Sequence, residues 1–328
     1  ARPAPDPLWP TLKGAGRPPA DARVSVLIPT VDRYPWLRVL LGQLAEQTVP
    51  PVEVIVVDQT PEQRREADLA AEFPALPLRV LVRREAGQCS SRNAGLDTAT
   101  GSHILFLDDD VEIEPTLIED HLRSLDATGA DVSSGVVEEM GAGPLAASFH
   151  RIRVSNVFPT NNTLIRAPVL AASGLFDLAY DRGQRADGDL GRRIYRTGAL
   201  MVLNPEISVL HHRAPRGGLR VHGARVDTYA ASRRALAARN LPTVSDLYLA
   251  RRYGTPRQAR EARVLGVLGT FAIRGGPLRK ALKAAVGVAR LPDTLVRIHR
   301  RSRAAERLLE RYPEIPPGDR FAPGAGRP

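Results

Sequence analysis

The sequence predicts an α/β protein in which helices flank a mostly parallel sheet and a helical extension follows. Two observations lead to this class. Short apolar runs alternate with segments of helical period over the first two thirds of the chain, as strands and helices do in such folds. Beyond residue 212 the apolar residues keep a helical spacing only.

The first elements follow from this alternation. Continuous apolar runs predict buried strands at 24–28, 52–57, 78–82 and 103–107. Apolar residues on one helical face predict helices at 36–47 and after Pro115. A helix is also expected at 61–72, with Pro61 in its first turn, and a short one at 90–99 that stops near Gly101.

The later elements are less regular. Short strands and loops are expected over 132–175. A helix at 190–197 is closed by Gly198 and followed by strands at 200–203 and 207–210. Helical patterns then cover 228–239, 244–253, 256–273, 278–288 and 295–312. The predicted organisation is a flexible lead-in, an α/β domain, a basic helical extension and a disordered tail, over residues 1–23, 24–212, 213–312 and 313–328.

Composition narrows the class of protein. The chain has 328 residues and 43% hydrophobic residues, which is typical of a folded protein with a sizeable core. The single cysteine, Cys89, excludes an intrachain disulfide and a cysteine-built zinc site. The longest apolar run, 264–273, is about half of what a membrane-spanning helix needs. The first ten residues lack the apolar core of a signal peptide.

Charge is divided unevenly along the chain. Residues 1–212 hold 21 Lys/Arg against 28 Asp/Glu, whereas residues 213–328 hold 25 against 8. The formal charge of +10 therefore belongs to the carboxyl-terminal third, which suggests an anionic partner for it.

Polar residues follow three of the predicted strands at the point where each ends. They are Pro29-Thr30, Asp58-Gln59 and Asp108-Asp109-Asp110. Because ligands of parallel α/β sheets bind beyond the carboxyl ends of the strands, we expect these residues to converge on one crevice.

The triple aspartate is the sharpest chemical signal. Three adjacent carboxylates repel one another unless water or a cation compensates them, and Mg²⁺ and Mn²⁺ prefer oxygen ligands. Asp108 and Asp110 can address one ligand from the same side of an extended chain, with Asp109 pointing away. A solvated acidic turn is the alternative, and the position beside two other polar strand ends favours the cation.

Several stretches together resemble family 2 glycosyltransferases. VSVLIPTVDRYPWL, VEVIVVDQT and AGQCSSRNAGLDTATGSHILFLDDDVEIEP resemble the nucleotide-sugar half of that family. NNTLIRAPVLAASGLFDLAY and RADGDLGRRIYRTGALMVLNPEISVLHH resemble the acceptor half, and the likeness covers about residues 24–212. The resemblance implies the GT-A fold and the inverting transfer of a sugar from a nucleotide-diphosphate sugar to an acceptor hydroxyl, as in polysaccharide biosynthesis at the cell envelope.

The resemblance also implies a donor site. The residues that would contact the nucleotide are Pro29, Thr30, Asp32, Asp58, Gly87, Arg92, Asn93, Asp108 and Asp109. Asp58 would accept a hydrogen bond from the base, and Arg92 would pair with phosphate or orient Asp108. Plain alternatives are a turn at Asp58 or at Gly87 and a surface position for Arg92.

A divalent metal, Mn²⁺ or Mg²⁺, would complete that site. Asp108-Asp109-Asp110 matches the DXD motif of the family, in which Asp110 would bind the metal directly and Asp108 would touch ribose or the water shell of the metal. His211 stands where many relatives place a histidine and would be a further ligand, although a histidine at a strand end can also be a simple polar contact.

The catalytic base implied by the resemblance is Asp187. The family has an acidic pair, one residue and then Asp-Leu, whereas this chain has Ala186-Asp187-Gly188-Asp189-Leu190. Ala186 departs from the pattern, but the acid that would deprotonate the acceptor is present. Asp189 is the competing base, and helix capping is the alternative role for Asp187.

Two further residues would face a sugar. Asn161 and Asn162 resemble the acceptor-side segment that contacts the donor sugar, and amides bind sugar hydroxyls well. A polar loop is the alternative.

The basic third has two interpretations. Its helices can lie on an anionic membrane surface and bring the enzyme to a lipid-linked acceptor, or they can form a helical cap whose arginines are solvated. An aromatic content of 5% and the absence of a recognition motif argue against nucleic acid. The expected location is cytoplasmic, at the inner membrane face if the helices bind lipid.

Two rival functions stay open at this stage. A non-catalytic nucleotide-sugar-binding or membrane-associated scaffold with the same fold would explain Ala186. A nucleotidyltransferase would need a Gly-rich loop with a following lysine to hold a triphosphate, and the sequence has none.

Overall fold

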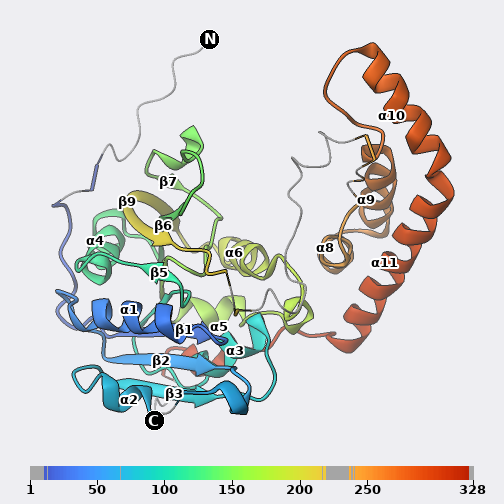
Figure 1. Ribbon diagram of the computed structural model, residues 1–328. Coiled ribbons are helices and arrows are strands. Elements are labelled where there is room, and N and C mark those ends of the chain that lie inside the picture. Colours follow the sequence, from blue (N-terminus) through green and yellow to red (C-terminus); the bar gives the residue numbers. More distant parts are fainter. Residues whose placement is uncertain are drawn as a thin grey trace. The chain divides into compact units, whose positions relative to one another are not determined.

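The computed structural model describes residues 11–12, 14–66, 68–215, 217–218, 236–237, 239 and 241–324 (Figure 1). The chain divides into two units. Unit 1 consists of residues 1–177, 186–221 and 315–328, and unit 2 consists of residues 178–185 and 222–314. The predicted boundary at 213–225 includes the passage from one unit to the other, but residues 216 and 219–225 lie outside the described part.

Unit 1 is built on the predicted parallel strands. They lie in the order β3-β2-β1-β4, with bounds Leu78–Val82, Glu53–Asp58, Val24–Thr30 and His103–Phe106. All three neighbouring pairs are parallel. Each strand begins and ends within two residues of its predicted bounds, because β1, β2 and β4 are covered on both faces and are apolar along most of their length. The prediction that 78–82 is buried is wrong, since β3 lies at the edge of the sheet and is half-buried to exposed.

The sheet continues from β4 as a mixed sheet, so that the described strands form one nine-stranded sheet. β8 (Thr163–Arg166) is antiparallel to β4, and β6 (Val132–Glu139) is antiparallel to β8 and parallel to β9 (Met201–His211). Two short strands, β5 (Val111–Glu112) and β7 (Arg153–Val154), pair with β9. The two strands predicted at 200–203 and 207–210 are one strand, whose pairing with β6 shifts register beside Gly135.

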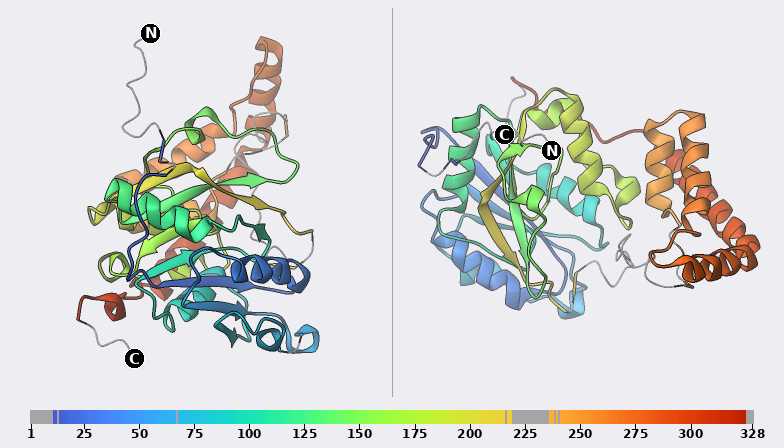
Figure 2. Two further views of the ribbon diagram at one scale, coloured as in Figure 1. Left: turned by 90° about the vertical axis from the view of Figure 1, so that its left-hand side faces the viewer. Right: turned by 90° about the horizontal axis from the view of Figure 1, so that it is seen from above.

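Helices cover both faces of this sheet (Figure 2). On one face, α1 (Tyr34–Ala45) and α4 (Leu117–Thr128) share the main hydrophobic core with alternate residues of β1 and β2, and α4 lies against β6, β8 and β9. On the other face, α3 (Gln88–Leu96) lies so close to Leu27 that only glycine fits at position 95. The shorter α5 (Val169–Ser173) precedes α6 (Ala186–Arg196), and η2 (Ala147–Phe149) is a single 3-10 turn.

The predicted helix at 61–72 is wrong. The segment contains the 3-10 turn η1 (Glu62–Arg64) and the four-residue helix α2 (Leu69–Glu72). The physical reason is that the polar run 62–66 has no apolar face to bury, and the left-handed backbone of Asp68 starts a new helix there.

Unit 2 contains the predicted carboxyl-terminal helices. They are α8 (Val244–Tyr253), α9 (Pro256–Gly269), α10 (Pro277–Ala289) and α11 (Leu291–Arg311), and the 3-10 turn η3 (Leu178–Tyr180) belongs to the same unit. Thr243 and Thr255 begin α8 and α9 with complete capping boxes, which fixes both starts. Most of the helix predicted at 228–239 lies outside the described residues. None of the helices within the described ranges is long and apolar enough to cross a membrane.

Both ends of the described chain belong to unit 1, which corrects the prediction of a disordered tail. Phe321 is buried in the 3-10 turn η5 (Asp319–Phe321), and the Leu175 amide donates to Pro316 O at 2.9 Å. In the predicted lead-in, Leu12 is buried and its amide donates to Glu206 Oε2 at 2.8 Å. Residues 1–10 and 325–328 lie outside the described ranges.

Candidate active site

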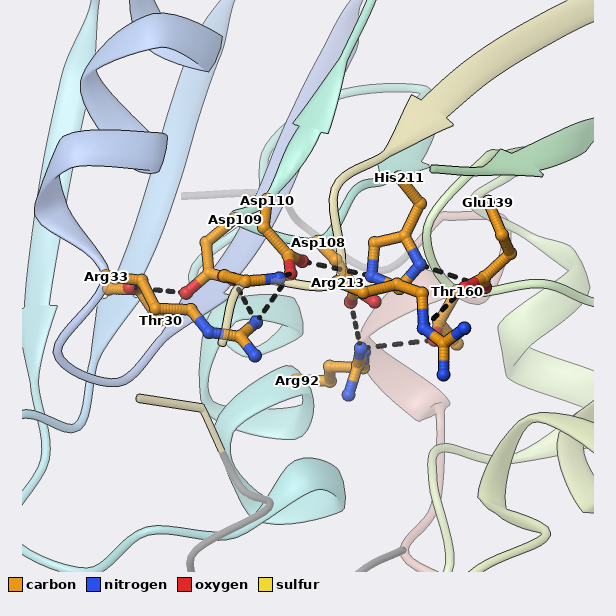
Figure 3. Close-up of polar contacts among 11 residues, drawn as sticks. Thr30, Arg33, Arg92, Asp108, Asp109, Asp110, Glu139, Thr160, His211 and Arg213 are labelled. Carbon is orange, nitrogen blue, oxygen red and sulfur yellow. Dashed lines mark hydrogen bonds and ion pairs between the residues drawn. The ribbon is translucent and has the colours of Figure 1, made fainter. Parts of the chain in front are cut away.

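The three consecutive aspartates follow β4 at the edge where the parallel strands end, as the sequence predicts (Figure 3). Asp109 turns toward the amino-terminal loop, where Thr30 Oγ1 donates to its Oδ2 at 2.7 Å and Arg33 Nη1 donates to its Oδ1 at 2.9 Å. Because Asp109 is buried and pairs with protein groups on both oxygens, its role is to hold the loop after β1 against the strand end.

Asp110 is the most heavily compensated carboxylate of the site. Arg33 Nη1 lies 3.2 Å from its Oδ2, and the Ala214 amide donates to the same oxygen at 2.8 Å. His211 Nε2 lies 3.2 Å from Oδ1. The backbone is tied as well, since the His212 amide donates to Asp110 O at 2.9 Å. The end of β9 is thereby fixed beside the triple aspartate.

Asp108, Asp110 and His211 bring one potential ligand atom each to within 4.8 Å of one another. Figure 3 shows the three side chains turned toward a common point. Behind them, Glu139 Oε1 lies 3.0 Å from His211 Nδ1 and fixes the ring, as a carboxylate behind a metal-binding histidine commonly does.

Arg92 supports this cluster from α3. Its Nη2 donates to Asp108 Oδ1 at 2.8 Å and to Thr160 Oγ1 at 3.1 Å, and its guanidinium lies over the ring of Phe176. The side chain is 8% exposed, so the surface position considered for Arg92 is wrong, and its guanidinium lies against Asp108.

The pKa values of the three aspartates are shifted in different directions. Burial raises the pKa of Asp108 and raises that of Asp109 to about 6, against the lowering charge of Arg33. Burial acts the same way on Asp110, but the hydrogen bond from His211 and the charge of Arg33 outweigh it and hold the pKa at about 2. Burial lowers the pKa of His211, and contact with Asp110 overcomes this and raises it to about 9.

The donor set fits a divalent cation. The two carboxylates suit Mg²⁺ and Mn²⁺, which both prefer oxygen ligands. The imidazole nitrogen favours the transition metal, Mn²⁺, over Mg²⁺. Asp110 Oδ1 is buried and takes no backbone donor, and its partner is His211 Nε2, 3.2 Å away. A cation here would take the place of the His211 imidazolium as the partner of that oxygen.

Asp58 lies at the end of β2, one strand away from the aspartates. Tyr34 OH donates to its Oδ2 at 2.7 Å and the Thr60 amide donates to its Oδ1 at 2.8 Å. Each oxygen keeps a second lone pair, so acceptance from a nucleobase stays a prediction. The Asp32 amide donates to Thr60 Oγ1 at 2.8 Å, which joins the loop after β1 to the loop after β2.

Three other residues that are predicted to contact the nucleotide pair with backbone atoms or with a neighbouring side chain of the protein. Pro29 pairs with Val57 within the sheet, in register between β1 and β2. Gly87 is extended and caps α3, and its amide donates to Gln59 Oε1 at 2.7 Å. Asn93 uses both ends of its amide on the Phe176 backbone, at 2.9 and 3.0 Å, and thereby ties α3 to that segment.

Asn162 is not a sugar-binding residue, which corrects the prediction. Its side chain is 0% exposed, and it accepts from His121 Nε2 at 2.9 Å and donates to Val136 O at 2.8 Å. A core amide with these partners cannot reach a sugar. Asn161 is half-buried in the turn before it, and its contact with a sugar stays a prediction.

The two candidate bases on α6 differ in exposure. Asp187 is exposed at the start of the helix, where its Oδ1 accepts from the Gly188 amide at 2.7 Å. Asp189 is buried and pairs with Arg193 Nε at 2.9 Å. Arg193 in turn donates to the Leu175 carbonyl at 2.7 Å, so Asp189 belongs to the packing of α6. The exposed Asp187 is therefore the better placed of the two to meet an acceptor.

Sequence reasoning missed two residues of the cluster. Arg33 compensates Asp109 and Asp110, and it could have been found as the first basic residue after a strand end that faces an acidic one. Glu139 ends β6 and holds His211. It gave no signal, because only the pairing of β6 with β9 brings it to the site.

Known proteins resemble this chain in sequence and in fold. The model of the family "Glycosyl transferase family 2" matches residues 25–172. The uncharacterized glycosyltransferase YwdF of Bacillus subtilis is 32% identical over 32% of this chain and 38% of its own length. The glycosyltransferase AglE of Haloferax volcanii is 29% identical over 47% of this chain and 55% of its own length. The matched region thus spans about half or less of each of these relatives.

Solved structures show the same fold. The mannosyltransferase PcManGT from Pyrobaculum calidifontis, in complex with GDP-Man and Mn²⁺, has a TM-score of 0.55 at 20% identity and covers 89% of this chain and 88% of its own. Staphylococcus aureus TarS 1-349, in complex with UDP-GlcNAc, has a TM-score of 0.50 at 18% identity and covers 79% and 69%. The predicted GT-A fold is confirmed by these likenesses.

Proposed function

We propose that this chain, whose residues 25–172 match the family 2 glycosyltransferase model, transfers a sugar from a nucleoside-diphosphate sugar to an acceptor hydroxyl with inversion, aided by a divalent cation. The observation that carries the proposal is the convergence of Asp108, Asp110 and His211 at the end of the parallel strands. The Mn²⁺ and GDP-Man in the PcManGT complex support the same donor class.

The donor half of the reaction would use the strand-end loops. Asp58 accepts from the nucleobase, and Tyr34 and the Thr60 amide hold its carboxylate in place. Asp110, with Asp108 and His211, would hold Mn²⁺ or Mg²⁺, which supplies positive charge against the departing diphosphate. Arg92 fixes Asp108 and adds a guanidinium close to the phosphates.

The acceptor half would use Asp187. In an inverting displacement the acceptor oxygen attacks the anomeric carbon from the side opposite the leaving group, so a base is needed on that side. The Asp187 carboxylate takes the proton of the acceptor hydroxyl, the C–O bond to the acceptor forms, and the bond to the diphosphate breaks with its electron pair on oxygen. The acceptor we propose is a saccharide or a lipid-linked saccharide of cell-envelope synthesis, glycosylated in the cytoplasm.

A donor panel tests the proposal. The purified protein is incubated with UDP- and GDP-sugars, with Mn²⁺, with Mg²⁺ or with chelator, and release of nucleoside diphosphate is measured. Metal-dependent release from one donor, lost in Asp187→Asn, is expected. Donor binding by calorimetry without any release, with saccharide acceptors present, would instead favour the non-catalytic nucleotide-sugar binder that Ala186 leaves open.

A further inference from the structure

The helix α10 of unit 2 buries a charged residue and exposes its large apolar residues. Its buried positions are Lys283, which is 2% exposed, and Gly287. The Lys283 ammonium is occupied within the protein, because it donates to Leu236 O at 3.0 Å. The large apolar residues are outside, with Leu278 74% and Val288 63% exposed. A helix of a free-standing domain buries the opposite set of residues.

The outward residues of α10 form one continuous face. At about 100° per residue, six exposed apolar positions span an arc of about 120° centred opposite Lys283 and Gly287. They are Leu278, Ala281, Leu282, Ala285, Val288 and Ala289. A contiguous exposed apolar face on a folded protein marks a site that binds another protein or a membrane.

The preceding helix α9 repeats the arrangement in its second half. Val264, Leu265 and Leu268 are each more than half exposed, on the side of the helix opposite the buried Ala259. The segment 270–276 joins the two helices within unit 2 (Figure 1).

Charge identifies what covers the face. Residues 256–300 contain ten Lys/Arg against two Asp/Glu, and α10 itself contains no acidic residue. Arg260 lies one turn before Val264 on the same side of α9, and the exposed Lys280 of α10 lies about 80° beyond the edge of its apolar arc. Exposed leucines bordered by basic side chains match a bilayer of anionic lipids, in which the leucines enter the interface and the cations meet the headgroups.

We propose that the outward faces of α9 and α10 dock this protein onto an anionic membrane surface. The helices lie on the bilayer, since none of the described ones is long and apolar enough to cross it. The proposal adds a membrane surface to the partners of the proposed function, and it does not depend on sugar transfer.

Vesicle flotation tests the docking without any sugar donor, so its failure is separate from a failure of the transferase proposal. The full chain should float with vesicles that contain phosphatidylglycerol and at least about tenfold less with pure phosphatidylcholine. The triple variant Leu278→Gln, Leu282→Gln, Val288→Thr should lose flotation by about tenfold or more. These side chains are exposed, so circular dichroism should show an unchanged fold. Arg260→Gln with Lys280→Gln should weaken binding to phosphatidylglycerol vesicles only.

The matched control is Val39→Gln with Val82→Thr, which removes exposed apolar residues from unit 1 and should leave flotation unchanged. Equal flotation of the triple variant and the wild type would overturn the proposal. So would a wild-type dimer, seen by sedimentation velocity, that the triple variant dissociates while vesicles bind neither protein. That result would assign the face to a second copy of this chain.

Discussion

The Nε2 atom of His211 lies 3.2 Å from Oδ1 of Asp110, although one residue ends β9 and the other follows β4. β4 and β9 are not neighbours in the sheet, but Asp110 directly precedes β5, whose Val111 pairs with His211 of β9. The His212 and Ala214 amides after β9 then donate to Asp110 and secure the contact. The candidate metal site therefore depends on the mixed half of the sheet as well as on the parallel half.

Replacing Asp110 should remove the contribution of the metal to donor binding. In Asp110→Asn the buried Oδ1 beside His211 becomes part of a neutral amide, which is a poor ligand for Mn²⁺. We expect the gain in donor affinity upon adding Mn²⁺ to fall by more than about tenfold, or 1.4 kcal/mol, in titration calorimetry. Asp120→Asn, on the surface of α4, is the control and should keep the gain. An unchanged Mn²⁺ effect in Asp110→Asn would remove this residue from the site.

The two carboxylates at the start of α6 should separate chemistry from stability. Asp187→Asn leaves an exposed side chain in place, so donor binding and melting temperature should stay while turnover falls by about 10²- to 10⁴-fold. Asp189→Asn weakens a buried pair with Arg193, so the free energy of unfolding should fall by about 1–3 kcal/mol. Turnover and thermal melts of both variants provide the measurement. The reverse pattern would make Asp189 the base.

Removing Arg33 should destabilise the protein in a way that Mn²⁺ repairs. Arg33→Met leaves Asp109 and Asp110 without their buried guanidinium, at a cost of about 3 kcal/mol. A cation bound beside Asp110 replaces part of that charge, so Mn²⁺ should raise the melting temperature of the variant more than that of the wild type.

Arg38→Met is the control for this loss. It breaks ion pairs with Glu66 and Glu72 that are about one third exposed, and it should cost less than about 1 kcal/mol. Equal melting temperatures for the two variants without metal would show that Arg33 does not hold the cluster together.

Stability should depend on pH through His121. The ring is fully buried between Ser133 and Asn162, and burial lowers its pKa to about 4, from 6.5 for an exposed histidine. Below pH 6.5 the unfolded chain binds the proton and the folded chain does not, so this contribution is complete above pH 6.5 and is lost as the pH falls toward 4.

Urea unfolding at pH 7.5 and 4.5 measures the effect. The stability difference between the wild type and His121→Gln should shrink by about 2–3 kcal/mol at the lower pH. His150→Gln, at an exposed position, serves as the control and should differ from the wild type equally at both pH values. A difference for His121→Gln that does not change with pH would contradict a neutral buried ring.

The parts of the fold that sequence reasoning predicted are those with a strong periodic signal. β1, β2 and β4 are buried on both faces, and α8 begins with a capping box, so pattern and structure agree there. The helix predicted at 61–72 does not form as one helix, because the polar residues at 62–66 give it no apolar face to bury.

The site was predictable where a residue follows a strand end directly. Thr30, Asp58 and Asp108–Asp110 meet at one sheet edge for that reason. Asn162 was predicted to contact a sugar because the sequence around it resembles a polar loop. In the structure its side chain lies in the core against His121. Glu139 depends on a pairing between β6 and β9 that no local pattern encodes.

The chain leaves unit 1 after Asp177, comes back at Ala186, and closes unit 1 with residues 315–324, of which Phe321 is buried. A chain truncated after α11 would keep the triple aspartate and Asp187, but unit 1 would lose its closing segment, residues 315–324. A chimaera that exchanges the helices of unit 2 should therefore replace them as an internal segment. The residues from 315 onward should be kept with unit 1.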